Sequence, residues 1–227
     1  AAMSEIDSGS HKIFRFRSDN AAMLRFVVLA LTLLAVTVPA QAQVDIMAPF
    51  NQSGAMDDAA VLAKDLPFAD GDRKRLDIYA PKQLAGPAPV VMFIYGGSWS
   101  DGDKDQYDFA GRALASLGYV VVIANYRLLP EIEYPNFLKD GAAAFDWVVA
   151  NIAGYGGDPE RIGLMGHSAG AYNAMMLLFD PAYLRALGHF GRVRAVVGLS
   201  GPYDFYPFDV PITRRTFGSV VNPEVTQ

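Results

Sequence analysis

The chain has 227 residues, 52% of them hydrophobic, and a formal net charge of −5. This composition is typical of one globular domain with a large buried core. The acidic balance, with no stretch dense in lysine and arginine, argues against nucleic acid as a partner. The chain has no cysteine, which excludes disulfides, thiolate chemistry and cysteine-based metal sites.

The N-terminal region carries the pattern of an export signal. Residues 23–42 combine a short basic start, an apolar run over 26–38 and an A-x-A cleavage pattern that ends at Ala42. The run is shorter than the roughly 18 residues that a membrane-spanning helix needs. We therefore expect a signal peptide, export to the periplasm or the medium, and a mature chain from Gln43 without a stable membrane span; an uncleaved anchor or a buried helix is the alternative. Residues 1–22 are polar and are expected to be an upstream extension or a sequence foreign to the fold.

After Gln43 the apolar pattern alternates between two kinds of segment. Residues 54–66 give a weak helical pattern, and residues 74–81 alternate in polarity and predict a strand. Short apolar runs rich in Val and Ile predict strands buried on both faces of a sheet: 90–95, 119–126, 161–166 and 193–200. Helical patterns lie between them, at 104–118, 136–154 and 171–179. This alternation predicts an α/β fold with a mostly parallel sheet flanked by helices and joined by right-handed crossovers.

Ser168 lies at the predicted turn from the strand 161–166 into a helix. The residues two before and two after it, Gly166 and Gly170, are glycines, as a tight and strained strand–turn–helix requires. Such a turn exposes the hydroxyl at the start of a helix, where amides and dipole favour negative charge. The pattern predicts a nucleophilic serine; an ordinary glycine-rich helix start is the alternative.

A second glycine-rich turn, "YGGSWSDGDK", follows the strand 90–95. Acyl transfer needs N–H donors directed at the developing oxyanion. One comes from the residue after the nucleophile, here Ala169, and others come from a glycine-rich loop after an earlier strand, here Gly97 and Ser98. A flexible loop is the alternative for this turn alone, but two complementary turns in this order favour an oxyanion hole.

Four motifs occur in order between residues 72 and 205: "YGGSW", "NYRLLP", "GGDPERI" and "GHSAG". This run resembles the α/β-hydrolase fold and, within it, the lipase and esterase group of hormone-sensitive-lipase-like, feruloyl-esterase-like and kynurenine-formamidase-like enzymes. The resemblance implies a serine carboxylic-ester hydrolase with Ser168 as nucleophile and Gly97, Ser98 and Ala169 as oxyanion donors. It implies a small-molecule ester substrate and no metal or cofactor, and no His/Asp/Glu cluster in the sequence has ligand spacing.

The sequence departs from the family pattern at three positions. Tyr95 stands where the family usually has histidine, Ser98 where many members have glycine, and Asn125 in place of the aspartate of D-Y-R. The oxyanion hole uses backbone N–H groups, so the changes at Tyr95 and Ser98 remove no donor.

A catalytic serine needs a base, and the family order is Ser, then Asp or Glu, then His. Of the three histidines, His11 precedes the signal pattern and His167 neighbours the nucleophile with its side chain directed away. His189 precedes the strand 193–200, at the opposite end of the sheet from the predicted elbow. Asp204, just past that strand, is a possible triad acid, and a turn-capping aspartate is the favoured alternative.

The tail has no pattern of a closing strand or helix, and residues 205–227 resemble the start of the insertion that often covers the active site in this family. We therefore expect residues 43–227 to be an α/β-hydrolase domain without its last strands, truncated at its C-terminus, with the triad histidine encoded after Gln227. A non-catalytic module with this fold is the alternative from another class of function. An amidase or peptidase is the alternative among enzymes.

Overall fold

A computed structural model describes residues 58–218. The expectations for the upstream residues 1–22 and the signal peptide 23–42 lie outside the described residues.

The centre of the fold is a six-stranded sheet in the order β1-β2-β4-β3-β5-β6. Its strands are β1 (Ala59–Pro67), β2 (Arg75–Pro81), β3 (Ala88–Ile94), β4 (Val120–Ala124), β5 (Gly157–His167) and β6 (Val193–Leu199). Strands β3 to β6 run parallel to one another, whereas β2 is antiparallel to both β4 and β1. The strands expected at 74–81, 90–95, 119–126, 161–166 and 193–200 are confirmed, with small shifts at their ends.

The helical prediction for residues 54–66 is wrong in its described part, because Ala59–Pro67 forms β1. The strand pairs with β2, and its register shifts twice, between Val61 and Ala63 and between Ala63 and Leu66. Each irregularity interrupts the alternation of side chains that marks a strand in a sequence. Pairing with a buried neighbour then decides the conformation rather than local propensity.

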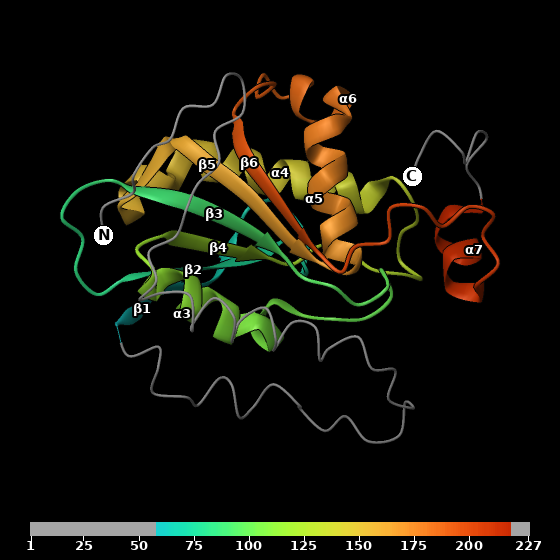
Figure 1. Cartoon of the computed structure of the whole chain (residues 1–227), viewed down its shortest axis with the longest axis horizontal. Coiled ribbons are helices and arrows are strands. Elements are labelled where there is room, and N and C mark those ends of the chain that lie inside the picture. Colours follow the sequence, from blue (N-terminus) through green and yellow to red (C-terminus); the bar gives the residue numbers. More distant parts are fainter. Residues whose placement is uncertain (1–57, 219–227) are drawn as a thin grey trace, which may run out of the picture.

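Helices cover both faces of the sheet (Figure 1). α3 (Asp108–Ser116) packs on β1, β2 and β4, while α4 (Asn136–Asn151) and α5 (Ala169–Phe179) pack together on the other face. This division follows from the strand order. The connection from β3 to β4 moves toward β1 along the sheet, whereas the connections from β4 to β5 and from β5 to β6 move in the opposite direction. Right-handed crossovers then place the helices on opposite faces.

Four short helices complete the described part: η3 (Lys104–Tyr107), η4 (Ile152–Tyr155), α6 (Pro181–Arg185) and α7 (Pro211–Phe217). The expectation of a tail without a helix is therefore wrong at α7. Pro211 occupies the first turn, where its fixed φ favours a helix start, and Thr216 and Phe217 are buried at the other end. Seven residues are too few to give a clear periodic signal.

The two halves of the sheet differ in burial. All five residues of β4 are buried, whereas β6 is an edge strand on which Val197 is 47% exposed. Within residues 58–218 no strand pairs with the outer edge of β6. Over the same residues, no helix is both long and apolar enough to cross a membrane.

Candidate active site

Ser168 forms a strained turn between β5 and α5. Its backbone has φ 52° and ψ −123°, a combination that costs a residue with a side chain about 1–3 kcal/mol and persists only where the surroundings enforce it. The Ser168 amide donates to the carbonyl of Leu199 on β6 (2.8 Å), and its carbonyl accepts from the amide of Ala171 (2.9 Å). The predicted strand–turn–helix at this serine is confirmed.

The glycines on either side of Ser168 allow close approach of backbones. A Cβ atom at Gly166 would lie 2.1 Å from the carbonyl oxygen of Gly170, and one at Gly170 would lie 2.1 Å from the carbonyl oxygen of Ile94. Both obstacles are backbone atoms, so neither can turn away as a side chain would. The elbow therefore requires glycine at both positions.

The loop of residues 96–99 lies directly against this elbow. A Cβ atom at Gly96 would come within 2.8 Å of both the Cβ of Ser168 and the carbonyl of His167. Gly97 has φ +141°, and Ser98 and Trp99 follow with φ 52° and 58°, which is a rare run of left-handed residues. The structure thus brings the predicted residues of the loop and the elbow together at the carboxyl ends of β3 and β5.

Backbone amides are available at this junction. Ala169 is the first residue of α5, so its N–H group has no acceptor within the helix. On the loop, the carbonyl of Gly97 accepts from the amides of Ser100 (3.1 Å) and Asp101 (2.9 Å), which closes a tight turn around Ser98.

The start of the loop is supported by buried Tyr95 and its hydrogen bonds to half-buried Arg73 and buried Tyr126. Arg73 donates to the Tyr95 hydroxyl (2.7 Å) and to the carbonyl of Gly102 (2.8 Å), and the Tyr126 hydroxyl donates to the Tyr95 carbonyl (3.0 Å). The rings of Tyr95 and Tyr126 stack at 4.8 Å. Burial raises the pKa of Tyr95 to about 12, against the opposing charge of Arg73, so the hydroxyl keeps its proton at neutral pH. Tyr95 supports the loop where the family pattern has histidine.

Asn125 joins the end of the loop to the sheet. Its Oδ1 atom accepts from the amide of Lys104 (2.8 Å), and its Nδ2 atom donates to the carboxylate of Asp103 (2.9 Å). An aspartate at this position could not donate and would face the Asp103 carboxylate. Asparagine therefore matches the local charge in this chain.

A cluster of ion pairs around buried Lys104 and Asp77 anchors η3, which follows the loop. Lys104 is 2% exposed, and its Nζ atom lies 3.1 Å from a carboxylate oxygen of the fully buried Asp77. The same Nζ atom lies 2.7 Å from a carboxylate oxygen of Asp65. The Nζ atom of Lys64 also pairs with Asp77, at 2.8 Å. Burial alone lowers the pKa of Lys104, but hydrogen bonds to Asp65 and Asp105 outweigh it and the pKa is raised. Lys104 is thus charged and ties η3 to β1 and β2.

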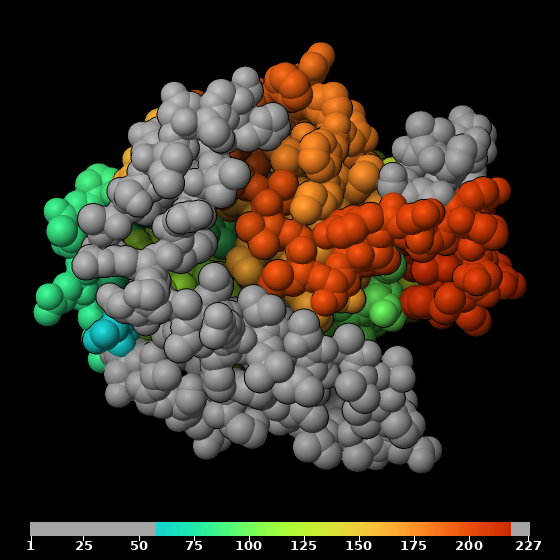
Figure 2. All heavy atoms as spheres, viewed as in Figure 1, coloured from blue at the N-terminus to red at the C-terminus, as the bar shows by residue number. Residues whose placement is uncertain are grey.

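An aromatic cluster lies beside the loop at the carboxyl end of the sheet. The Trp99 and Phe217 rings meet edge to face at 4.9 Å, and Trp99 also contacts Tyr172 at 5.6 Å. Tyr134, Phe137, Phe205 and Phe208 complete the ring contacts with Phe217. In Figure 2 the red segment that leads to α7 lies on the visible surface of the molecule.

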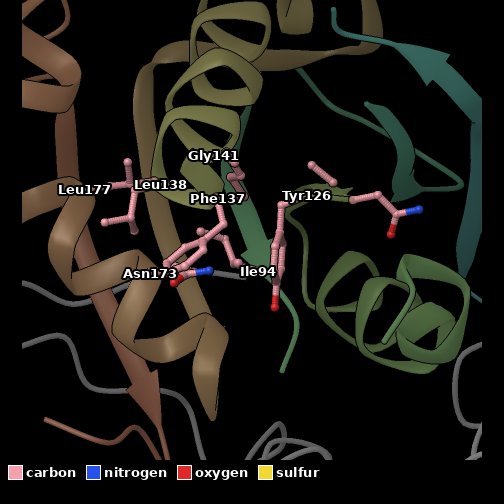
Figure 3. Close-up of a pocket in the computed structure, with 10 residues that line it drawn as sticks. Ile94, Tyr126, Phe137, Leu138, Gly141, Asn173 and Leu177 are labelled. Carbon is pink, nitrogen blue, oxygen red and sulfur yellow. The ribbon is translucent and has the colours of Figure 1, made fainter. Parts of the chain in front are cut away.

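The cavity between the sheet and helices α4 and α5 is distinct from the elbow (Figure 3). Its volume of about 10 Å³ admits one water molecule but no acyl group. Side chains of Ile94, Phe137, Leu138 and Leu177 line it together with Asn173. This cavity is therefore a packing feature and not an ester site.

Neither described histidine is placed to accept the proton of Ser168. His189 lies before β6, whose first residue Val193 pairs with Ile162, and its Nε2 atom is 2.6 Å from Asp146 on α4. Ser168 follows the opposite end of β5, so His189 lies at the other end of the sheet, as expected. His167 is buried with its Nδ1 atom 3.0 Å from the Tyr107 hydroxyl.

Asp204 is exposed in the connection from β6 to α7, and no interaction in the described part of the chain favours the acid role over a turn residue. Within residues 58–218 no group of three or more His, Asp or Glu side chains could hold a metal ion.

Three residues that the sequence did not single out contact the predicted site. Tyr107 bonds His167, 60 residues away, and the Trp99 indole bonds Asn173, 74 residues away. Trp99 belongs to the glycine-loop motif and could have been singled out. Tyr107 and Asn173 lie in segments that read as ordinary helix.

The strained serine on a mostly parallel sheet, with a glycine loop packed against it, defines the α/β-hydrolase fold. Crystal structures of esterases have the same fold. Esterase B from Lactobacillus rhamnosus, inhibited by a C6-C4 SN3 compound, matches with a TM-score of 0.68 and 22% identity, over 91% of this chain and 70% of that one. The thermophilic carboxylesterase EstE1, cloned from a metagenomic library, matches with a TM-score of 0.53 and 27% identity, over 79% of this chain and 52% of that one.

The sequence profile of the BD-FAE family matches residues 76–219, and the chain belongs to this family. It is 36% identical over 144 residues to the probable isoprenylcysteine alpha-carbonyl methylesterase ICMEL1 of Arabidopsis thaliana, covering 60% of this chain and 30% of that protein. It is 35% identical over 159 residues to the probable carboxylic ester hydrolase LipM of Mycobacterium tuberculosis, covering 64% of this chain and 37% of that protein. The chain thus spans about a third of the length of these curated relatives.

Proposed function

We propose that this protein is a carboxylic-ester hydrolase that acts by acyl transfer through Ser168. The observation that carries the proposal is the strained backbone of Ser168, with φ 52° and ψ −123°, beside a loop of left-handed residues. Strain of this kind is retained where a functional geometry requires it. The esterase relatives support the same reaction class.

In the proposed reaction the Ser168 hydroxyl attacks the ester carbonyl and loses its proton to a base. The carbonyl oxygen becomes an oxyanion, and the amides of Ala169, Gly97 and Ser98 donate to it. Such donors contribute about 10² to 10³ in rate each. The base returns this proton to the alcohol oxygen as the bond between the acyl carbon and that oxygen breaks. Water then loses a proton to the same base and attacks the acyl-serine, and the acid leaves as the proton returns to the Ser168 oxygen. This route uses serine and backbone groups and calls for no metal or cofactor.

The base is proposed to be a histidine outside residues 58–218. In the described part of the chain, His189 is engaged by Asp146 and His167 by Tyr107. Asp204 remains the proposed triad acid from these residues. Asp204 follows β6, which lies next to β5, the strand before Ser168. The segment that carries Asp204 therefore begins at the same carboxyl end of the sheet as Ser168.

Two further proposals concern the surroundings of the reaction. Residues 205–227 are proposed to begin a cap over the site, and the packing of Phe205 and Phe217 on Trp99 of the loop supports this. Export is proposed from the signal pattern of residues 23–42, with a small-molecule ester as substrate.

Labelling with a fluorophosphonate tests the nucleophile. The protein expressed from its complete reading frame, and the control variant Ser116→Ala on α3, should each take one label per chain. Ser168→Ala should take none, and peptide mass spectrometry should locate the wild-type label on Ser168. A labelled Ser168→Ala variant would contradict the proposal. An unlabelled wild type would favour a non-catalytic module.

A further inference from the structure

One hydroxyl joins the two halves of the candidate site. Tyr107, at the end of η3, is 3% exposed, and its Oη atom lies 3.3 Å from the amide of Gly96 and 3.0 Å from Nδ1 of His167. Gly96 opens the loop that carries Gly97 and Ser98. His167 immediately precedes Ser168. A single side chain therefore links the first residue of the loop 96–99 to the residue before Ser168.

Donor and acceptor chemistry fixes the direction of the hydrogen bond between Gly96 and Tyr107. The Gly96 N–H group can only donate, so the Tyr107 oxygen accepts there. Among residues 58–218, Nδ1 of His167 is the remaining hydrogen-bonding partner of this hydroxyl. With the ring proton of His167 on Nε2 the Tyr107 hydroxyl donates to Nδ1, and in the other tautomer Nδ1 donates to the Tyr107 oxygen, so the two side chains are hydrogen-bonded in either tautomer. Burial raises the pKa of Tyr107 well above its ordinary value, and the hydroxyl keeps its proton at neutral pH.

A second buried contact holds the other end of the loop. The indole nitrogen of Trp99 donates to Oδ1 of Asn173 at 3.0 Å, and both side chains are buried. Asn173 lies on α5, the helix that starts directly after Ser168, and Figure 3 shows it on the inner side of that helix, next to Phe137 and Ile94. The loop is thus joined to the chain on both sides of the nucleophile.

We propose that Tyr107 and Asn173 are positioning residues that hold the loop 96–99 at a fixed distance from Ser168, and this inference rests on the proposed function. The loop contains consecutive residues with positive φ, a conformation that needs support from its surroundings. A misplacement of about 1 Å in a catalytic group can reduce the rate about 10²-fold. Loss of either contact therefore reduces the stabilisation of the oxyanion more than the binding of the ester.

Kinetics of Tyr107→Phe on a short-chain ester test the positioning role. Phenylalanine keeps the ring packing and removes both hydrogen bonds. We expect kcat to fall about 10- to 100-fold with KM changed less than about twofold. The matched control is Tyr119→Phe, a half-buried tyrosine at the amino end of β4, which should retain the wild-type kcat. Circular dichroism checks that each variant is folded.

A double-mutant cycle tests the second contact. Trp99→Phe and Asn173→Leu should each lower kcat, and the double variant should be no slower than the slower single variant, because both changes remove one hydrogen bond. Additive losses, or a rise in KM at constant kcat, would overturn the positioning role.

Nitrogen NMR of the histidines tests the link without reference to activity. In protein labelled with ¹⁵N-histidine, the Nδ1 shift of His167 should change in Tyr107→Phe but not in Tyr119→Phe. An Nδ1 shift of His167 that is unchanged in Tyr107→Phe would overturn the link. If the wild type takes no fluorophosphonate label, the proposed function fails and so does the positioning role in catalysis, while this spectrum still decides whether the link exists.

Discussion

The candidate site joins two regions that are supported very differently. The loop and the start of η3 are held by half-buried Arg73, just before β2, by buried Asn125, just after β4, and by the ion pairs of buried Lys104. The segment after β6, by contrast, follows an edge strand and carries exposed Tyr203, Tyr206 and Val210. The difference shows that the loop beside Ser168 is supported by many side-chain contacts, whereas the segment after β6 leaves large side chains exposed to solvent.

The largest effect is expected for Ser168→Ala, because Ser168 is the proposed nucleophile. Hydrolysis of a short-chain ester should fall by about 10⁴-fold or more. Stability should change little, because the small side chain leaves the backbone contacts of the elbow in place. Assays of ester hydrolysis, with Ser116→Ala as the control variant, measure this loss of activity. A variant that keeps a tenth of the activity would contradict the assignment.

The next largest effect is a loss of stability that should differ between a glycine of the turn at Ser168 and a glycine on the surface. Gly170→Ala would place a methyl group 2.1 Å from the Ile94 carbonyl, whereas a Cβ atom at Gly154 meets nothing within 4 Å. We expect Gly170→Ala to destabilise the protein by about 3 kcal/mol and to abolish labelling. Gly154→Ala should stay within about 0.5 kcal/mol of the wild type. Equal unfolding midpoints in denaturant would contradict the close packing of the elbow.

Two strands of the sheet give a direct test of the difference in packing. Ile123 on β4 is fully buried, and Ile123→Ala should lower the free energy of unfolding by about 3 kcal/mol. Val197 on β6 is 47% exposed, and Val197→Ala should change the free energy of unfolding by about 0.5 kcal/mol or less. Denaturant titrations of the 227-residue chain compare the two. A similar loss at both positions would mean that β6 is covered by a segment outside residues 58–218.

The smallest effect concerns the ion cluster at η3. Burial tends to raise the pKa of Asp105, but hydrogen bonds to Lys104 and Lys64 outweigh it and the pKa is lowered from 3.8. A carboxyl whose pKa falls on folding stabilises the fold above its unfolded pKa, and this contribution is lost as the pH falls through 3.8 and below. Asp105→Asn should flatten the acid side of the stability profile by less than about 1 kcal/mol, since the carboxylate is partly exposed. An unchanged acid slope would argue against the pairing.

The sequence predicts features that depend on neighbours along the chain. The turn at Ser168, the glycine loop and the continuous apolar strands can each be recognised from a short stretch of sequence. The structure confirms their geometry. The strand β1 and the helix α7 were missed for physical reasons. The irregular register of β1 hides its alternation, and α7 is stabilised by the burial of Phe217 against distant rings rather than by its own pattern.

The side chains that support the loop could not be predicted from the sequence, for a related reason. Tyr107 and Asn173 act through partners that are 60 and 74 residues away, and nothing in a single sequence marks such pairs. Asn125 was visible as a departure from the family pattern, but its role depends on the neighbouring Asp103 carboxylate and the Lys104 amide.

A crystal structure of the protein after reaction with a phosphonate ester tests the central claim most directly. The account predicts a covalent bond from Oγ of Ser168 to phosphorus, with the phosphoryl oxygen within about 2.7–3.1 Å of the amide nitrogens of Ala169 and of the loop at Gly97 or Ser98. An adduct on another residue, or a phosphoryl oxygen turned away from these amides, would contradict it.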